Sequence, residues 1–193
     1  MSKRILYFFV VLAGTFLLQG CSYNSIVSYD EGTKKAWADV EASYQRRADL
    51  IDNLVQTVKG EAKFEKETLT AVIEARSKAS SIQLKADDLT PENIAKFQAA
   101  QSQLSGALTR LLAVAEQYPD LKTNAQFGEL MNELERTENR INIARRDYNQ
   151  SVQEYNTQIR SFPANITAGL FKFKPREPFK SDAGSEKAPK VQF

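Results

Sequence analysis

The sequence predicts an all-α protein, an elongated antiparallel up-down-up-down four-helix bundle with long first and fourth helices. Between Tyr23 and Phe162 only six glycines and prolines interrupt the chain. The alternation of apolar and polar residues that is typical of strands is missing, and apolar residues recur every three or four positions instead. Connections between the apolar segments are short, which favours antiparallel neighbours. The 193 residues support one ordinary domain.

The N-terminal segment carries a targeting pattern. Lys3 and Arg4 precede an apolar run from Ile5 to Leu18, and Gly20 precedes the single cysteine, Cys21. Leu18-Gln19-Gly20-Cys21 resembles the lipobox of bacterial lipoproteins, which implies a signal peptide over residues 1–20 and a lipid anchor on Cys21. The resemblance also implies that Ser22, in place of an aspartate, favours the outer over the inner membrane. The alternative is an uncleaved anchor helix, and either reading holds the chain at a membrane.

The first helix is expected from about residue 24 to residue 59, and the second from about residue 64 to residue 86, with Gly60 at the break. The first carries two adjacent stripes, which together are wide enough to face two neighbours. The many alanines of the second imply close packing. The first stripe of the first helix consists of Trp37, Val40, Tyr44, Arg47, Ile51, Leu54 and Val58, and the second stripe of Ala48, Val55 and Ala62. The inward residues of the second helix are Leu69, Val72, Ala75, Arg76, Ala79 and Ile82.

The third helix follows the clearest boundary in the chain, where Thr90 is the expected N-cap and Pro91 the first helical residue. Its pattern continues to Tyr118 and is stopped by Pro119. The fourth helix is expected from about residue 124 to residue 162, where Pro163 ends it. The inward residues are Ile94, Phe97, Gln101, Leu104, Leu108, Leu111, Ala115 and Tyr118, then Met131, Leu134, Glu138, Ile141, Arg145, Tyr148, Val152, Tyr155, Ile159 and Phe162.

Four charged residues occupy positions where these stripes call for apolar side chains: Arg47, Arg76, Glu138 and Arg145. A lone buried charge is costly, so each is expected to have a partner or to reach the surface along its own stem. The first hypothesis is a polar core network that fixes the relative position of the helices. The second is a polar pocket for an anionic ligand or a partner's side chain.

Helices one and four are expected to extend past the shorter pair at the membrane end, because they are each about 55 Å long against about 35 and 42 Å. We call this two-helix part the neck, residues 26–29 and 155–162. It predicts a partly covered, tyrosine-rich surface for a partner or a second copy, with Tyr29, Tyr155, Ile159 and Phe162 as candidate contacts. The alternative is that the neck and the C-terminal tail cover each other.

The C-terminal tail, residues 164–193, is expected to be extended and follows the bundle domain, residues 21–163. From Lys172 onward it holds six basic and three acidic residues. The membrane-surface hypothesis uses phenylalanines inserted among basic residues that lie near anionic headgroups. Its candidates are Phe171, Lys172, Phe173, Lys174, Arg176, Phe179 and Lys180. Packing of these phenylalanines back on the neck is the alternative.

Composition removes several kinds of chemistry. The absence of histidine excludes Ser-His-Asp and Cys-His catalysis, histidine zinc sites and Glu-x-x-His di-iron centres. A single cysteine excludes an internal disulfide and a CxxC motif. From residue 21 onward 24 basic residues balance 24 acidic ones, so the sequence does not favour nucleic acid as a partner. We therefore expect no cofactor and no metal.

Several segments together resemble the LemA family of bacterial membrane-associated proteins. They are residues 46–51, 53–55, 57–60, 65–69 and 72–76, residues 137–163 of the last long helix, and Phe171-Lys172-Phe173, Pro178-Phe179 and residues 189–193 of the tail. The resemblance implies a long helical bundle outside the cytoplasmic membrane and a family of largely undefined molecular activity. Asp52, Glu61 and Phe64 stand where a proline, an aromatic residue and a histidine are usual, and the lipobox departs from the family's common uncleaved helix.

The leading functional hypothesis is a non-enzymatic, lipid-anchored envelope protein that acts as a helical scaffold or interaction module. It would face the periplasm, with the membrane as partner through Cys21 and with a protein partner or self-association. The alternative is a lipid or small-amphiphile carrier with a slot between its helices. An enzyme ranks third, because the sequence offers no nucleophile with a base and no phosphate-binding glycine loop.

Overall fold

The computed structural model describes residues 2–60, 64–86 and 88–180, and for residues 2–21 the helical backbone alone. The regular structure of these residues is entirely helical, so the all-α prediction is confirmed. The helices are α1 (Ser2–Lys59), α2 (Lys66–Ser81), α3 (Pro91–Ala115), α4 (Pro119–Thr123), α5 (Ala125–Arg160) and α6 (Ala164–Leu170).

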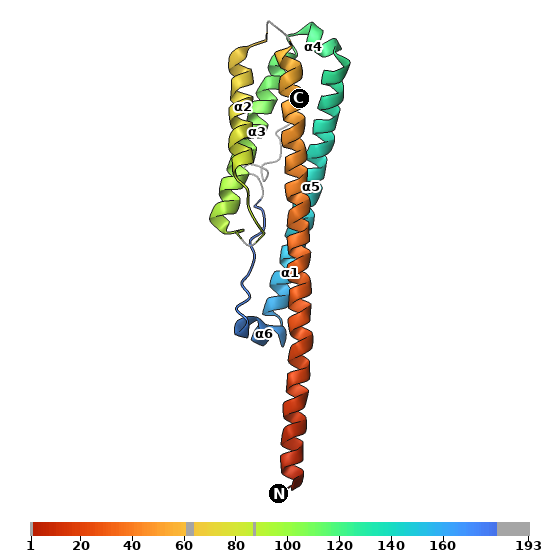
Figure 1. Ribbon diagram of the computed structural model, residues 1–193, viewed down its shortest axis with the longest axis vertical. Coiled ribbons are helices and arrows are strands. Elements are labelled where there is room, and N and C mark those ends of the chain that lie inside the picture. Colours follow the sequence, from red (N-terminus) through yellow and green to blue (C-terminus); the bar gives the residue numbers. More distant parts are fainter. Residues whose placement is uncertain (1, 61–63, 87, 181–193) are drawn as a thin grey trace, which may run out of the picture.

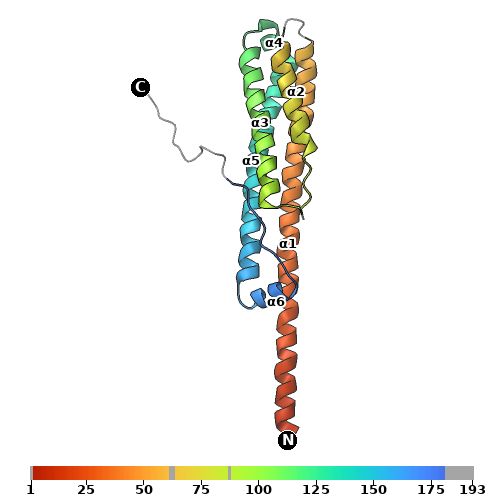
Figure 2. The ribbon, with the colours of Figure 1, turned by 90° about the vertical axis from the view of Figure 1, so that its left-hand side faces the viewer.

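The long helices lie in two pairs. Helix α5 packs along α1, and α3 packs along α2 (Figure 1). The end of the molecule that carries α4 contains all of the long helices. Further along the molecule α5 and α6 accompany α1, and beyond them α1 continues alone (Figures 1 and 2). In the part of the chain that the structure describes, no helix combines the length and the apolar character needed to cross a membrane.

Helix boundaries follow local signals where these are strong. The hydroxyl oxygen of Thr90 accepts a hydrogen bond from the Asn93 amide at 3.2 Å, and Pro91 is the first residue of α3, as predicted. The side-chain oxygen of Asn124 caps α5 by accepting from the amides of Gln126 and Phe127 at 2.9 and 3.1 Å.

Several boundaries differ from the prediction, and two helices were not predicted. Helix α3 ends at Ala115 and α5 at Arg160, three and two residues before their predicted ends. Helix α1 begins at Ser2, because the apolar run joins the following segment without a proline. Helix α2 ends at Ser81, since residues after it turn toward α1, where Leu84 accepts a hydrogen bond from the Trp37 indole at 2.9 Å. The short helices α4 and α6 were not predicted, and α6 occupies the start of the tail that was expected to be extended.

The core consists of three clusters along the rod. Aliphatic residues of α1, α2 and α3 fill the end near α4. An aromatic cluster around Trp37, Phe97, Tyr148 and Phe179 fills the middle. A small cluster around Ile26 lies in the neck. The middle and neck clusters both contain residues from beyond α5, so the C-terminal segment is part of the fold.

Candidate functional site

The predicted polar core network is only partly assembled. Arg47 is 3% exposed, and its Nη1 donates to Glu138 Oε2 at 3.0 Å and to Ser105 Oγ at 3.3 Å. Its Nη2 donates to Gln101 Oε1, and its guanidinium lies 5.0 Å from the centre of the Tyr44 ring. Arg47 and Glu138 thus meet as predicted, and their surroundings are hydroxyl and amide groups.

Arg76 and Arg145 do not join this network. Arg76 pairs with Asp52, at the edge of α1, and donates to the Ala48 carbonyl at 3.3 Å. Arg145 donates to the Lys180 carbonyl at 3.2 Å, and its guanidinium lies 5.1 Å from the centre of the Phe179 ring. The structure therefore does not bring the four residues into one network: Arg76 binds α1, and Arg145 binds the C-terminal segment. In the described residues no group of three acidic or cysteine side chains is placed to hold a metal ion.

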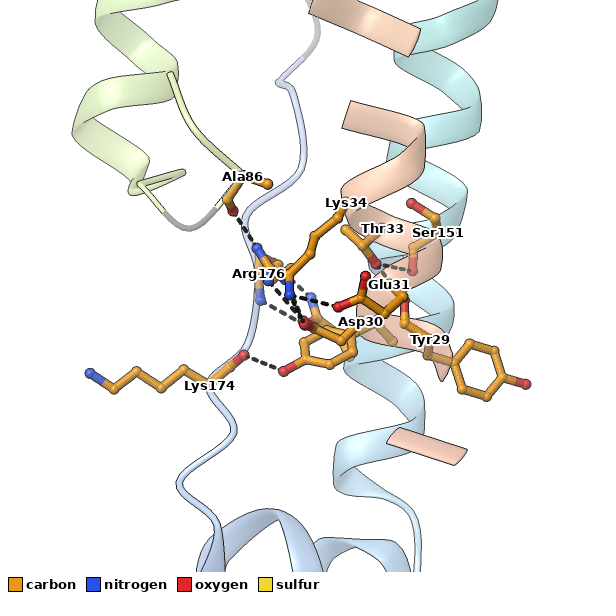
Figure 3. A network of polar contacts seen from close by, with 11 residues as sticks. Tyr29, Asp30, Glu31, Thr33, Lys34, Ala86, Ser151, Lys174 and Arg176 are labelled. Atoms are coloured by element: carbon orange, nitrogen blue, oxygen red, sulfur yellow. Dashed lines mark hydrogen bonds and ion pairs between the residues drawn. The ribbon is translucent and has the colours of Figure 1, made fainter. Parts of the chain in front are cut away.

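A polar clasp of Asp30, Glu31, Lys34, Arg176 and the Ala86 carbonyl lies next to the neck (Figure 3). Arg176 Nε and Nη2 both donate to Oδ1 of Asp30, at 2.9 and 2.8 Å, and its Nη1 donates to the Ala86 carbonyl. Lys34 Nζ reaches Asp30 Oδ2 at 3.0 Å and Glu31 Oε1 at 2.8 Å. One arginine therefore joins α1, the connection between α2 and α3, and the C-terminal segment.

Two Tyr-Asn pairs on α5, which we call the Tyr-Asn ladder (Tyr148, Asn149, Tyr155 and Asn156), hold this C-terminal segment by its main chain. Each asparagine binds one residue through both its amide and its carbonyl: Asn156 binds Arg176 at 2.8 and 2.9 Å, and Asn149 binds Phe179 at 3.1 and 2.8 Å. The two phenols donate to the carbonyls of Lys174 and Glu177, each at 3.0 Å.

The spacing of the ladder explains why it fits an extended chain. Seven residues of α-helix rise about 10.5 Å, and three residues of extended chain span about 10 Å. Asn149 and Asn156 are seven residues apart, and their partners Phe179 and Arg176 are three apart. The two spacings are therefore nearly equal, and each Tyr-Asn pair meets an equivalent part of the main chain.

The structure brings three of the candidate membrane-surface residues into contact with other parts of the fold. Phe179 is 4% exposed and stacks on Trp37 with ring centres 5.7 Å apart. Phe173 packs on the neck cluster, and Arg176 is bound in the clasp. The ladder binds the main chain of Arg176 and Phe179, and the Phe173 amide donates to the Ala168 carbonyl at 2.9 Å. Phe171, Lys172, Lys174 and Lys180 are exposed.

Of the four candidate neck contacts, two are buried and two are exposed. Tyr155 and Ile159 are 2% and 6% exposed and pack with Ile26, so they are not available as a contact surface. Tyr29 is 39% exposed and Phe162 81%. Tyr29 lines a shallow groove of about 670 Å³ along α5, whose other lining residues are polar: Arg146, Asn149, Gln150, Gln153, Glu154, Thr157 and Gln158.

A second groove, of about 450 Å³, lies where α1 meets α3 and the end of α2. The aromatic side chains of Trp37, Tyr44 and Phe97 line it. Glu41 also lines it, and burial raises the pKa of this carboxyl above its usual range. The sequence hypothesis of a slot between helices corresponds to this place in the structure.

The site also contains residues that sequence reasoning missed. The exposed apolar residues of α6, Ile166 and Leu170, were not predicted, because the helix itself was not. A weak signal was present: the small residues Ala164, Thr167 and Ala168 have the three-four spacing of one helix face, and Ile166 and Leu170, four residues apart, share the other face.

Substituting alanine for Asn149 and Asn156 together is expected to release residues 174–180 from α5. Each asparagine makes two hydrogen bonds to the tail main chain, and a typical one contributes about 1 kcal/mol. Amide hydrogen exchange of Arg176 and Phe179 should become much faster. Asn142→Ala, an exposed residue seven positions before Asn149, is the control. Equal exchange rates in the double variant and the control would contradict the role of the ladder.

The ladder should also weaken at high pH. Burial raises the pKa of Tyr148 to about 12; Arg176 opposes the rise and Glu177 adds to it. The folded state therefore holds the phenol proton more tightly than the unfolded chain, in which tyrosine titrates near pH 10. Its stabilisation is complete below pH 10 and is lost as pH rises from about 10 to 12. Unfolding free energies measured across this range should fall less steeply in Tyr148→Phe, and an identical slope would sink the assignment.

Comparison with known proteins gives a family match over most of the chain. The model of the LemA family matches residues 36–193. The magnetosome protein MamQ 2 of Paramagnetospirillum magneticum is 29% identical over 187 residues, which cover 88% of this chain and 68% of that protein. The protein LemA of Metamycoplasma hominis is 26% identical over 164 residues, which cover 85% and 71%. The magnetosome protein MamQ of Magnetospirillum gryphiswaldense is 27% identical over 174 residues, which cover 81% and 64%.

Proposed function

The chain belongs to the LemA family, and from this premise we propose that it is a non-enzymatic, lipid-anchored protein of the bacterial envelope that acts as a helical scaffold or interaction module. Its long helices would form an antiparallel four-helix bundle that faces the periplasm, at the outer rather than the inner membrane. The partner would be another envelope protein or a second copy of the chain.

The observation that carries the proposal is the exposed Tyr29 beside its amide-lined groove. Contacts of α5 support the groove. Asn149 and Asn156 bind the C-terminal segment, and Arg176 of that segment binds Asp30 of α1. Amide and hydroxyl side chains suit the main-chain groups of a protein partner, and an exposed tyrosine supplies contact area at little entropic cost. A preorganised surface of this kind favours binding without turnover.

Photo-crosslinking in intact cells tests the proposal. A photoreactive residue at Tyr29 or Gln153, both of which line the groove, is expected to give protein adducts that mass spectrometry can identify. Matched positions at Ile73 of α2 and Asp120 of α4, which are also exposed, should give few. Adducts that are confined to lipid, or that are equally frequent at all four positions, would overturn the scaffold proposal.

The lipid anchor has its own test. The side chain of Cys21 lies outside the part of the chain that the structure describes, so its support is the sequence pattern alone. Cells fed a clickable fatty acid should label the wild-type protein and should not label Cys21→Ser. An unlabelled wild-type protein would refute lipidation and leave the uncleaved helix as the anchor.

A lipid or small-amphiphile carrier is the second candidate, and the groove lined by Trp37, Tyr44 and Phe97 favours it. Protein extracted in a mild detergent should then retain a small amphiphile in native mass spectrometry. Ala42→Trp, which adds a large side chain at an exposed position of the groove lining, should abolish retention. A wild-type protein that carries no amphiphile would exclude this candidate.

A further inference from the structure

Exposed apolar side chains gather at one end of the molecule. Among the described residues, those most exposed for their size are Phe162 at 81%, Leu170 at 67%, and Ile166 and Phe171 at 55% each. Tyr23, at 38%, lies against Phe171 with ring centres 4.8 Å apart. We call these five residues the collar: Phe162 precedes α6, Ile166 and Leu170 belong to it, Phe171 follows it, and Tyr23 lies on α1. Helix α6 lies beside α1 at the end of α5 (Figure 1).

Helix α6 buries its small residues and exposes its larger apolar ones. Its small residues Ala164, Thr167 and Ala168 are 2–5% exposed and pack near Ile26 and Ile159. The larger Ile166 and Leu170 lie on the opposite face. A short helix with this division usually buries its larger residues, since that burial stabilises the fold. Here the small residues pack within the fold, and the larger ones are exposed, which indicates contact with something outside the chain.

The charges of this end have a single sign. Neither residues 1–29 nor residues 155–176 contain an aspartate or a glutamate, although the chain has 24 acidic residues. Arg160, Lys172 and Lys174 are exposed in the same region. A protein partner of mixed charge gives no reason for such a segregation, whereas an anionic lipid surface does.

Position along α1 agrees with the charges. The apolar run ends at Leu18, and the five residues from there to Tyr23 rise about 7.5 Å along the helix. The headgroup region of a bilayer extends about 5–7.5 Å beyond the hydrocarbon on each side. If the chain instead starts at a lipidated Cys21, Tyr23 follows only two residues after the acyl chains. In both cases the collar lies at the depth that aromatic side chains prefer.

We propose that the collar is a membrane-surface contact: its five apolar side chains enter the headgroup region, while Arg160, Lys172 and Lys174 bind anionic lipid phosphates. This deepens the proposed function and rests on its membrane attachment. The contact holds the bundle upright on the bilayer and sets the height of the Tyr29 groove above it.

Fluorescence quenching in vesicles tests the contact directly. Full-length Leu170→Trp is reconstituted in vesicles of phosphatidylglycerol and phosphatidylcholine with brominated acyl chains, which quench tryptophan on contact. The native Trp37, 1% exposed, supplies a constant background. Emission of the new tryptophan should be strongly quenched, and Ile73→Trp, a 39% exposed residue of α2, should be unaffected. Equal emission of the two variants in brominated and ordinary vesicles would overturn the proposal.

A second measurement separates the collar from the anchor. In the Cys21→Ser background, replacing Lys172 and Lys174 by glutamine should lower partition into phosphatidylglycerol vesicles about fivefold for each charge. It should leave partition into pure phosphatidylcholine unchanged. Quenching at position 170 without fatty-acid labelling would refute the anchor and keep the collar. Labelling of Cys21 without quenching would refute the collar and keep the anchor.

Discussion

Trp37→Ala is expected to lower the free energy of unfolding by about 3–5 kcal/mol, the range found for large aromatic residues removed from a core. For a chain of this length the midpoint of thermal unfolding should fall by about 6–20 °C. Circular dichroism during heating and denaturant titration would measure both quantities.

The size of this effect follows from the position of the indole. Trp37 is 1% exposed, and its ring contacts Phe97, Tyr148 and Phe179 at centre distances of 5.9, 5.4 and 5.7 Å. Its Nε1 donates to the Leu84 carbonyl. One side chain thus joins α1 to α3, α5, the residues after α2 and the C-terminal segment, and its loss should also accelerate exchange of the Phe179 amide.

Two controls separate these contributions. Trp37→Phe keeps an aromatic ring but removes the hydrogen bond to Leu84, and should cost about 1–2 kcal/mol. Ile73→Ala changes an exposed side chain of α2 and should stay within about 0.5 kcal/mol of the wild type. A loss in Trp37→Ala no larger than that in Ile73→Ala would contradict the central place of the indole.

Glu138→Ala is the second substitution with a large expected effect, a loss of about 2–3 kcal/mol. The Arg47 side chain is 4% exposed, and Glu138 supplies the carboxylate 3.0 Å from its Nη1. Removing one member of a buried pair leaves an uncompensated charge, at a cost of about 3–5 kcal/mol. Because Glu138 is 49% exposed, water partly replaces it, and the expected loss is smaller.

Arg47→Met provides the comparison. It removes the buried charge and keeps similar volume, so stability should change by less than about 1.5 kcal/mol. In that background Glu138→Ala should cost little, which a double-mutant cycle measures as coupling between the two residues. A full loss for Glu138→Ala in both backgrounds would refute the pairing. If the Arg47 layer binds an anionic ligand instead, phosphate should restore the stability of Glu138→Ala.

The sequence by itself determined what depends on neighbours along the chain. The three-four spacing of apolar residues gave helices, and Thr90 with Pro91 gave the start of α3, since an N-cap and a first-turn proline act within four residues. Arg47 and Glu138 could be paired because each is a charge on an apolar stripe and needs compensation. The same reasoning did not separate Arg76, which binds Asp52 outside the stripe of α1, from the Arg47 pair, and it could not place Arg145, whose partner lies on the C-terminal segment.

Only the tertiary structure determined where the C-terminal segment packs. A Tyr-Asn pair on a helix looks the same in sequence whether water or a main chain satisfies its amide. Seven helical residues and three extended residues have nearly equal lengths, but this matters only when the two segments lie side by side. That approach buried Phe179 and bound Arg176 to Asp30, although the sequence pattern had made both candidates for the membrane surface, and it left Ile166 and Leu170 of α6 exposed. Burial depends on which segments meet in space, and a local pattern does not contain that information.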